Sequence, residues 1–287
     1  MKAGAAFSAD WLALREPFDA AARAASAPLL QALRARAPAS GPWRVMDLGC
    51  GTGANLRWLA PRLGGAQQWL VIDHDESLLA RWDHQPGFAP ADAGRLRWQG
   101  AGFSAEVLRR QTDLARGFAA LPWAAAHLVT ASALLDLVGE AWLRALVAHA
   151  SGARATLFFA LSVDGRHVWS PRDPHDAAVD TLFAAHQRRD KGLGPALGAQ
   201  AVPMLARLLR ERGYRVRLAR SDWRVAAPHD PDGALQRALI EGLARAAQEQ
   251  DPAQAPLVRG WRERRLAQVA RGRLRVGHLD LLAWPAR

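Results

Sequence analysis

Apolar and polar residues follow two different periods along this chain, and the two periods alternate from residue 43 onward. Five short apolar runs predict buried strands: Arg44–Leu48, Trp69–Ile72, Arg95–Gln99, His127–Leu134 and Thr156–Leu161. Segments with helical spacing lie between them: Ala54–Leu63, Glu76–Trp82, Phe103–Arg110 and Glu140–Ala150. Strands that alternate with helices are typical of a parallel sheet with helices on both faces. The sequence therefore predicts an α/β fold.

Both ends of the chain depart from this alternation. Residues 5–36 have helical spacing and are separated from the first strand by a breaker rich in proline, glycine and serine. After the fifth strand we predict, in order, a long connection at Val163–Ala199, a helix at Ala201–Arg212, a strand at Tyr214–Leu218, helices at Gly233–Gln250 and Leu257–Arg271, and a last strand at His278–Trp284. We therefore expect a helical cap at 1–40 and a domain at 41–287 with helical insertions at about 163–199 and 229–275.

Composition narrows the class of protein. The 287 residues are 50% apolar and 23% charged, which is typical of a globular protein and excludes disorder and collagen. The single cysteine, Cys50, allows no disulfide within the chain and favours a cytoplasmic location. No secretory signal is visible. The stretch Gly117–Leu135 carries no formal charge, but Pro122 and His127 within it argue against a membrane span, and we expect no membrane partner.

A glycine-rich motif ends the first predicted strand and opens a helix. It reads Asp47-Leu48-Gly49-Cys50-Gly51-Thr52-Gly53. Glycines at such a turn let the backbone approach a ligand closely, and the N-terminus of the helix presents unpaired N–H groups. Asp73 ends the second strand, where a carboxylate can accept hydrogen bonds from both hydroxyls of a ribose. Together these residues predict a site for a cofactor that contains a nucleoside.

The identity of the cofactor depends on Asp47. Gly49, Gly51 and Ala54 also fit the dinucleotide pattern G-x-G-x-x-G/A, which leaves a nicotinamide cofactor as an alternative. The negative charge of Asp47, however, lies beside the place of a pyrophosphate and suits a ligand with an ammonium group instead. At this motif the sequence resembles the class I S-adenosylmethionine-dependent methyltransferases, whose first motif reads acid-x-Gly-x-Gly-x-Gly. The resemblance covers about residues 40–165 and the closing antiparallel strand.

The resemblance implies a Rossmann-like, mostly parallel seven-stranded sheet with the last strand antiparallel, and S-adenosyl-L-methionine as the cofactor. It also implies a role for each matched residue. Asp47, Gly49, Cys50 and Gly51 would lie at the methionine moiety, Asp73 at the ribose, His74 at the adenine, Gln99 or the backbone of Ala101 at the adenine amine, and Ala131 and Ser132 at the sulfonium. Many family members carry an acid at the end of the third strand, and in this sequence none lies between Gln99 and Glu106.

Two residues are candidates for proton transfer. Asp136 follows the fourth strand and could orient a substrate or take a proton, or it could simply cap the next helix. His186 lies in the long connection, where a histidine could deprotonate a nucleophile near neutral pH or end a polar helix. No H-E-x-x-H motif occurs, and His167 and His175 are too scattered to predict a metal site. We expect no metal.

The strand order that the resemblance implies places the helices at 233–271 at the cofactor end of the sheet, and we expect the N-terminal cap and Val163–Ala199 to reach the same end. Three segments converging there would form a lid, which favours a small substrate, an anionic one included, enclosed away from water. The net charge of +11 supports an alternative, an RNA methyltransferase. That alternative would use Arg259, Arg262, Arg264, Arg265, Arg271, Arg273 and Arg275, for which a solvated helix face is the other interpretation. A cofactor-binding protein without catalysis is a further alternative.

Overall fold

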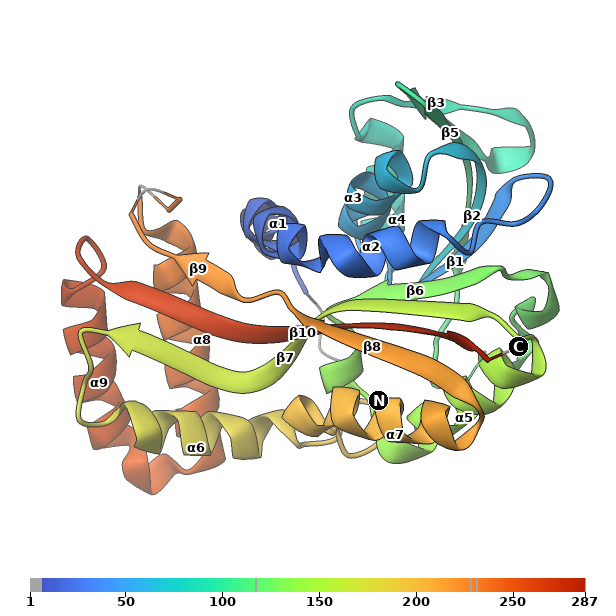
Figure 1. The fold of residues 1–287 in the computed structure, drawn as a ribbon. Helices are drawn as coiled ribbons and strands as arrows, with labels where there is room; N and C mark the ends of the chain where they lie inside the picture. Colours follow the sequence, from blue (N-terminus) through green and yellow to red (C-terminus); the bar gives the residue numbers. More distant parts are fainter. Residues whose placement is uncertain (1–6, 117, 228, 231, 287) are drawn as a thin grey trace.

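The computed structural model of the protein describes residues 7–286 except 117, 228 and 231 (Figure 1). The strands are β1 (Trp43–Leu48), β2 (Gly65–Asp73), β3 (Phe88–Pro90), β4 (Leu96–Gly100), β5 (Phe103–Gln111), β6 (Leu128–Ser132), β7 (Thr156–Ser170), β8 (Tyr214–Arg220), β9 (Trp223–Val225) and β10 (Arg273–Pro285). The α-helices are α1 (Ala9–Arg23), α2 (Ala27–Arg34), α3 (Ala54–Leu63), α4 (Glu76–Ala80), α5 (Glu140–Gly152), α6 (Asp176–Gln187), α7 (Ala201–Glu211), α8 (Ala234–Gln250) and α9 (Ala255–Ala267).

The order of the strands confirms the predicted fold class. Among the described residues one mixed sheet has the order β3-β4-β5-β2-β1-β6-β7-β10-β8, and β9 pairs with β10. β5, β2, β1, β6 and β7 are parallel neighbours, whereas β10 runs antiparallel between β7 and β8. Strands β5 to β8 of this order form the predicted seven-stranded sheet with its antiparallel last strand. β3 and β9 were not predicted, and β4 was predicted as a strand but not as an antiparallel addition at the edge of the sheet.

The segment Phe103–Arg110, expected to be a helix, is strand β5. Its buried and more exposed side chains alternate, which is the two-residue period of a strand. It pairs in parallel with the whole of β2. The run at Arg95–Gln99 is β4, which is antiparallel to β5 and joined to it by a short turn. The prediction was wrong because the apolar residues of this segment also fit a helical spacing.

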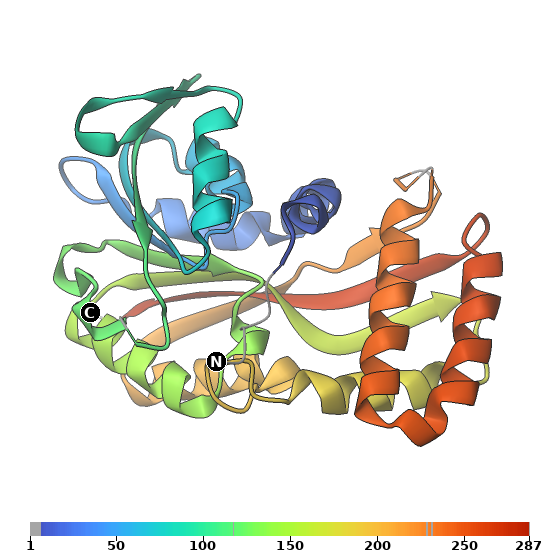
Figure 2. The same cartoon turned by 180° about the vertical axis from the view of Figure 1, so that it is seen from behind.

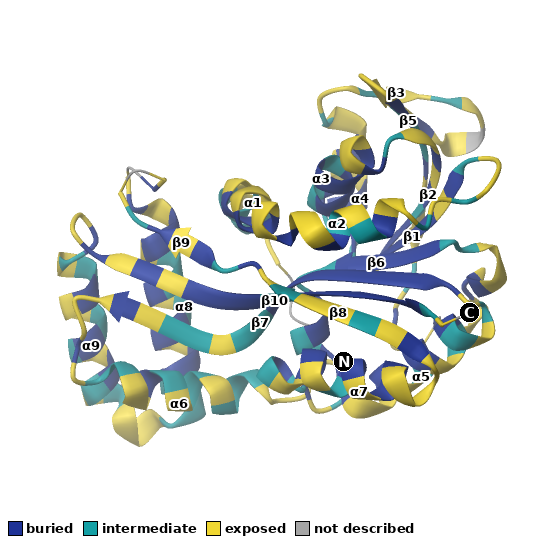
Figure 3. Cartoon of the chain, in the orientation of Figure 1, coloured by how far each residue is buried: buried dark blue, intermediate teal, exposed yellow. Residues whose placement is uncertain are grey.

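Helices cover both faces of the central sheet. α2 and α3 pack on one face through Leu33 and Leu56, which are both fully buried (Figure 1). α5 and α7 pack on the other face through Leu143 and Leu205. Figure 3 shows that buried residues are concentrated in the central strands between these layers. Because both faces are covered, a ligand reaches this sheet at the carboxyl ends of its parallel strands.

The two predicted insertions build an extension of the sheet. β7 continues to Ser170 and β10 begins at Arg273, so both strands run past the central sheet as an antiparallel pair (Figures 1 and 2). α6, α8 and α9 pack beside this pair around a separate apolar cluster that includes Trp169, Val179 and Trp261. Residues 163–170 were expected in a helical insertion but form strand. None of the helices in the described ranges is long and apolar enough to cross a membrane.

Candidate functional site

The glycine-rich loop after β1 has a backbone that only glycine adopts readily. Gly49, Gly51 and Gly53 have φ values of 65°, 51° and 93°, in the left-handed region. A side chain at Gly53 would also place its Cβ 2.7 Å from the Trp82 ring. The indole nitrogen of Trp82 donates a hydrogen bond of 2.9 Å to the carbonyl of Gly51 and so holds the loop in place. The spacing of the motif thus follows from the turn that these residues make.

Asp47 lies behind this loop and is completely buried. Its Oδ1 accepts a hydrogen bond of 2.7 Å from Nδ2 of Asn55, which also contacts Thr130. Burial raises the pKa of Asp47 to about 7, although the hydrogen bond from Asn55 and the charge of Arg23 oppose the shift. Oδ2 of Asp47 and Oδ1 of Asn55 have no hydrogen-bond partner within the described residues. Buried acceptors of this kind call for a donor.

Two carboxylates stand at the adjacent ends of β2 and β5. Asp73 is buried, and its two oxygens accept hydrogen bonds from the amides of Gly51 (2.8 Å) and Asp75 (3.0 Å). β5 ends beside it, because the amide of Thr112 donates to the carbonyl of Asp73 over 2.8 Å. The next residue is Asp113, whose side chain is half exposed. Asp113 is therefore the acid that follows the third parallel strand, beside the end of β2.

These groups surround a pocket of about 1050 Å³ that crosses the carboxyl ends of β5, β2, β1 and β6 in that order. Its lining comprises Phe7, Leu12, Arg15, Asp19, Gly49–Thr52, Ala54, Asn55, Asp73–Leu78, Asp113–Arg116, Ser132–Leu134, Leu137 and Lys191–Leu193. Helix α1 forms one wall. Leu12 lies so close to Gly51 that a Cβ on that glycine would sit 3.1 Å from the leucine. An ion pair between Glu16 and Arg57 fastens α1 to α3.

The structure brings most of the predicted cofactor residues together. Gly49, Cys50, Gly51, Asp73, His74 and Ser132 all line the pocket. Asp47 does not line it, but its partner Asn55 does. Ala131, next to Ser132 on β6, is buried and does not line the pocket. His74 has its Nδ1 3.3 Å from Asp73 and is exposed.

Gln99 and Ala101 lie at the other end of the sheet, so their predicted contact with the adenine amine is wrong. Gln99 is near the end of β4 and Ala101 is in the β4–β5 turn, where the carbonyl of Gly102 accepts a hydrogen bond of 2.8 Å from the amide of Gly65, the first residue of β2. Asp73 is the last residue of that strand. The error follows directly from taking β4 for the third parallel strand.

His186 is also separated from the pocket, and its predicted catalytic role is wrong. It lies in the last turn of α6, and its Nε2 is 3.1 Å from the carboxylate of Glu249 on α8. Asp136 is half-buried in a 3-10 turn, Leu135–Leu137, next to Leu137 of the pocket wall. Burial raises the pKa of Asp136, and the nearby charges of Lys191 and Arg15 oppose that rise. Asp136 therefore lies near the pocket without lining it, and a role for it in orienting the substrate stays a prediction.

The expected lid is only partly present. α1 and the loop at Lys191–Leu193 line the pocket, whereas no residue of α8 or α9 does in the part of the chain that the structure describes. The sequence analysis missed Asp113, Asn55, Arg15 and Lys191 as site residues. The alternation in β5, read together with the Gly100–Gly102 turn, would have located Asp113. Asn55 directly follows the glycine motif and could have been included with it. Arg15 and Lys191 were not detectable, because distant parts of the fold bring them to the pocket.

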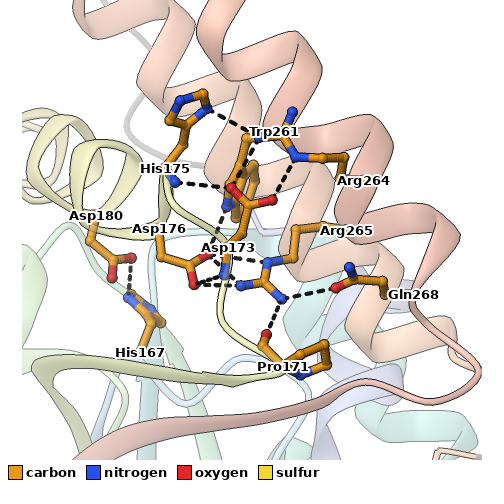
Figure 4. Close-up of polar contacts among 10 residues, drawn as sticks. All are labelled: His167, Pro171, Asp173, His175, Asp176, Asp180, Trp261, Arg264, Arg265 and Gln268. Atoms are coloured by element: carbon orange, nitrogen blue, oxygen red, sulfur yellow. Dashed lines mark hydrogen bonds and ion pairs between the residues drawn. The ribbon is translucent and has the colours of Figure 1, made fainter.

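The arginines of α9 and the start of β10 are largely neutralised. Arg262 pairs with Glu241 at 2.6 Å, Arg264 with Asp173 at 2.6 Å and Arg265 with Asp176 at 2.5 Å. Figure 4 shows the last two pairs joining α9 to the start of α6, with His175 against Arg264 and His167 against Asp180. No group of three or more histidine, cysteine or acidic residues suited to a metal ion occurs among residues the structure describes.

Solved structures resemble this arrangement. A cyclopropane-fatty-acyl-phospholipid synthase-like protein from Lactobacillus casei matches 99% of this chain and 96% of its own, with 13% identity and a TM-score of 0.53. The fold is the Rossmann-like fold of S-adenosylmethionine-dependent methyltransferases. An S-adenosylmethionine-dependent methyltransferase from Mesorhizobium loti matches 93% of this chain and 98% of its own at 19% identity, with a TM-score of 0.41.

A phosphoethanolamine N-methyltransferase 2 from Haemonchus contortus matches 91% of this chain at 12% identity, with a TM-score of 0.39. This chain spans about half of that protein, covering 53% of it. No protein-family model and no curated protein matches this sequence.

Proposed function

We propose that the protein is an S-adenosylmethionine-dependent methyltransferase that acts on a small molecule. The observation that carries this proposal is the continuity of the pocket. Besides the glycine loop, Asp73 and Asp113, the same pocket is lined by Leu12, Leu137 and Lys191–Leu193, and we assign these residues to a second part that would hold the acceptor. A protein that only stores the cofactor needs no such second part. The enclosure by α1 and one loop favours a small acceptor over a polymer.

The residues of the first part fit the cofactor. Asp73 would accept hydrogen bonds from the ribose, and Asp113 would accept one from the adenine amine. The orphan oxygens of Asp47 and Asn55 supply buried acceptors behind the loop, which suit the ammonium of the methionine moiety. The glycine loop leaves room where any side chain would intrude. S-adenosylmethionine, when bound, supplies a methyl group on a positively charged sulfur.

The second part of the pocket positions the acceptor. Ser132, at the end of β6, also lines the pocket, and Leu134 and Leu137 provide apolar contacts and exclude water. Asp136 lies next to Leu137 but does not line the pocket itself, so we assign it no direct proton transfer. Holding two reactants in line accounts for much of the rate in such a reaction, so a rigid wall can act without a base in contact with the acceptor.

Binding of S-adenosylhomocysteine, the demethylated product, tests the cofactor assignment. We expect calorimetry to detect binding to the purified protein. Asp73→Ala should weaken it by about tenfold or more, because a hydrogen bond to a charged group contributes about 1.5–3 kcal/mol. Asp113→Asn should weaken it less, since that side chain is half exposed.

Asp83→Ala serves as the matched control. Asp83 belongs to the same part of the fold, but it pairs with Arg109 at 2.9 Å and does not line the pocket. The affinity of this variant for S-adenosylhomocysteine should therefore equal that of the wild type. Equal affinities in the wild type and Asp73→Ala would overturn the role of Asp73. Tight binding of NADH in place of S-adenosylhomocysteine would overturn the proposed function.

A further inference from the structure

Lys191 is the cation of the pocket that has no counter-ion in contact. Two arginines also line the pocket, and each has a carboxylate partner. Arg15 pairs with Asp19 at 2.9 Å and Arg116 pairs with Asp113 at 3.8 Å. Lys191 forms no ion pair with any residue that the structure describes. The sequence at positions 1–6, 117, 228, 231 and 287 contains no acidic side chain that would supply one.

The loop that carries Lys191 is held firmly against the pocket wall. The amide of Gly139 donates to the carbonyl of Leu193 over 2.9 Å, and the amide of Leu197 donates to the carbonyl of Val138 over 2.9 Å. A Cβ on Gly139 would lie only 3.1 Å from the Leu193 carbonyl oxygen. Within the loop, Asp190 accepts a hydrogen bond of 2.7 Å from the amide of Gly192. The fold therefore presents Lys191 to the pocket from an anchored position.

The surroundings of Lys191 are half-buried and mostly apolar. Burial lowers the pKa of Lys191, and the charge of Asp136 opposes this without forming an ion pair. Asp136 does not line the pocket within the described residues. Leu137, Leu193 and, from α1, Leu12 line the same pocket as Lys191. A partly desolvated cation without a contacting anion is unfavourable, and a ligand anion would relieve the cost.

We propose, on the basis of the proposed function, that the methyl acceptor carries an oxyanion which binds Lys191 and an apolar body which packs against Leu12, Leu137 and Leu193. A carboxylate and a phosphate share this chemistry. Arg15 is not the binding residue, because its guanidinium is held by both oxygens of Asp19 and lies 5.1 Å from the centre of the Trp223 ring. Lys191 thus selects the class of acceptor.

The test uses the full-length protein saturated with S-adenosylhomocysteine and three probes of one chain length: hexanoate, hexyl phosphate and hexan-1-ol. We expect at least one anionic probe to bind about tenfold more tightly than the alcohol, as expected for a hydrogen bond to a charged group. The preferred anion identifies the source of the oxyanion. Lys191→Met should reduce its affinity to that of hexan-1-ol, whereas Lys191→Arg should keep most of the preference.

Arg188→Met is the matched control, because Arg188 is an exposed cation three positions earlier in the same segment and does not line the pocket. It should leave the preference for the anion intact. An alcohol that binds as tightly as both anions, or an anion preference that survives in Lys191→Met, would overturn the inference. If S-adenosylhomocysteine itself fails to bind, the proposed function fails instead, so the two failures are distinguishable.

Discussion

At the scale of the residue, the buried carboxyl group of Asp47 lowers the stability of the fold and places a titratable acid behind the glycine loop. The carboxyl group is completely buried, and one of its oxygens has no partner in the described part of the chain. A buried carboxylate is costly unless it is fully hydrogen-bonded. Burial raises its pKa from 3.8 to about 7 in the folded protein. The residue is therefore poorly placed for stability alone, which agrees with a role in holding an ammonium group.

This shift predicts a pH-dependent effect of Asp47→Asn. Between pH 4 and about 7 the unfolded chain has lost the proton while folded Asp47 keeps it, so rising pH lowers the free energy of unfolding of the wild type. The variant lacks this loss. Its stability relative to the wild type should therefore increase from pH 4 to pH 7 by roughly 4 kcal/mol at most, at 1.36 kcal/mol per pKa unit. Above pH 7 the difference should stay constant.

Urea denaturation of both proteins across this pH range measures the difference. The same variant should bind S-adenosylhomocysteine more weakly at pH 7.5, because the charge that attracts its ammonium group is gone. A difference in stability that does not change with pH would contradict burial as the cause of the shift.

At the scale of the element, the contact of α6 with α9 depends on one buried arginine. Arg265 is 1% exposed, and its guanidinium binds Asp176 and the carbonyl of Pro171 at 2.8 Å (Figure 4). Trp261 donates a hydrogen bond of 2.9 Å to the same aspartate. The extension therefore contains a polar centre, and an unpaired charge there would be strongly unfavourable.

We expect Arg265→Met to lower the free energy of unfolding by about 3–5 kcal/mol, because it leaves the carboxylate of Asp176 without its cation. Arg262→Met is the matched control. That arginine pairs with Glu241, and both side chains are partly exposed, so its loss should lower the free energy of unfolding far less than the loss of Arg265. Chemical denaturation compares the two. Equal losses would show that the buried pair has no special weight.

At the scale of the whole molecule, the net charge of +11 comes from many arginines, and some of these pair with carboxylates while others do not. Four of the seven arginines in 259–275 pair with carboxylates: Arg262, Arg264, Arg265 and Arg275. Arg259, Arg271 and Arg273 are exposed and have no ion pair among the described residues. A phosphate backbone would have to compete with the acidic partners of the first group. The geometry favours an internal role for most of this cluster.

We therefore expect RNA to bind weakly. Each phosphate contact releases counterions, so binding by a few free arginines should fade as salt approaches physiological concentration. A filter-binding titration with total cellular RNA measures this, and Arg259→Ala combined with Arg273→Ala should change only the weak binding at low salt. Retention at micromolar protein and physiological salt, lost in that double variant, would favour an RNA substrate.

The sequence by itself determined the class of the fold and the core of the site. The alternation of strand and helix patterns predicted the central sheet, and the glycine motif together with Asp73 predicted a nucleoside site at residues that line one pocket. These features depend on local conformation, a turn that requires positive φ and a strand followed by a helix, and neighbouring residues encode such features.

Tertiary structure alone decided the rest of the site. Whether Phe103–Gln111 forms a helix or a strand depends on pairing with β2, and that pairing brings Asp113, rather than Gln99 or Ala101, to the pocket. It also placed His186 against Glu249 and brought Lys191 to the pocket through its contact with Gly139. Contacts between residues far apart in the sequence leave no periodic signal, so only the packed fold determines which side chains meet.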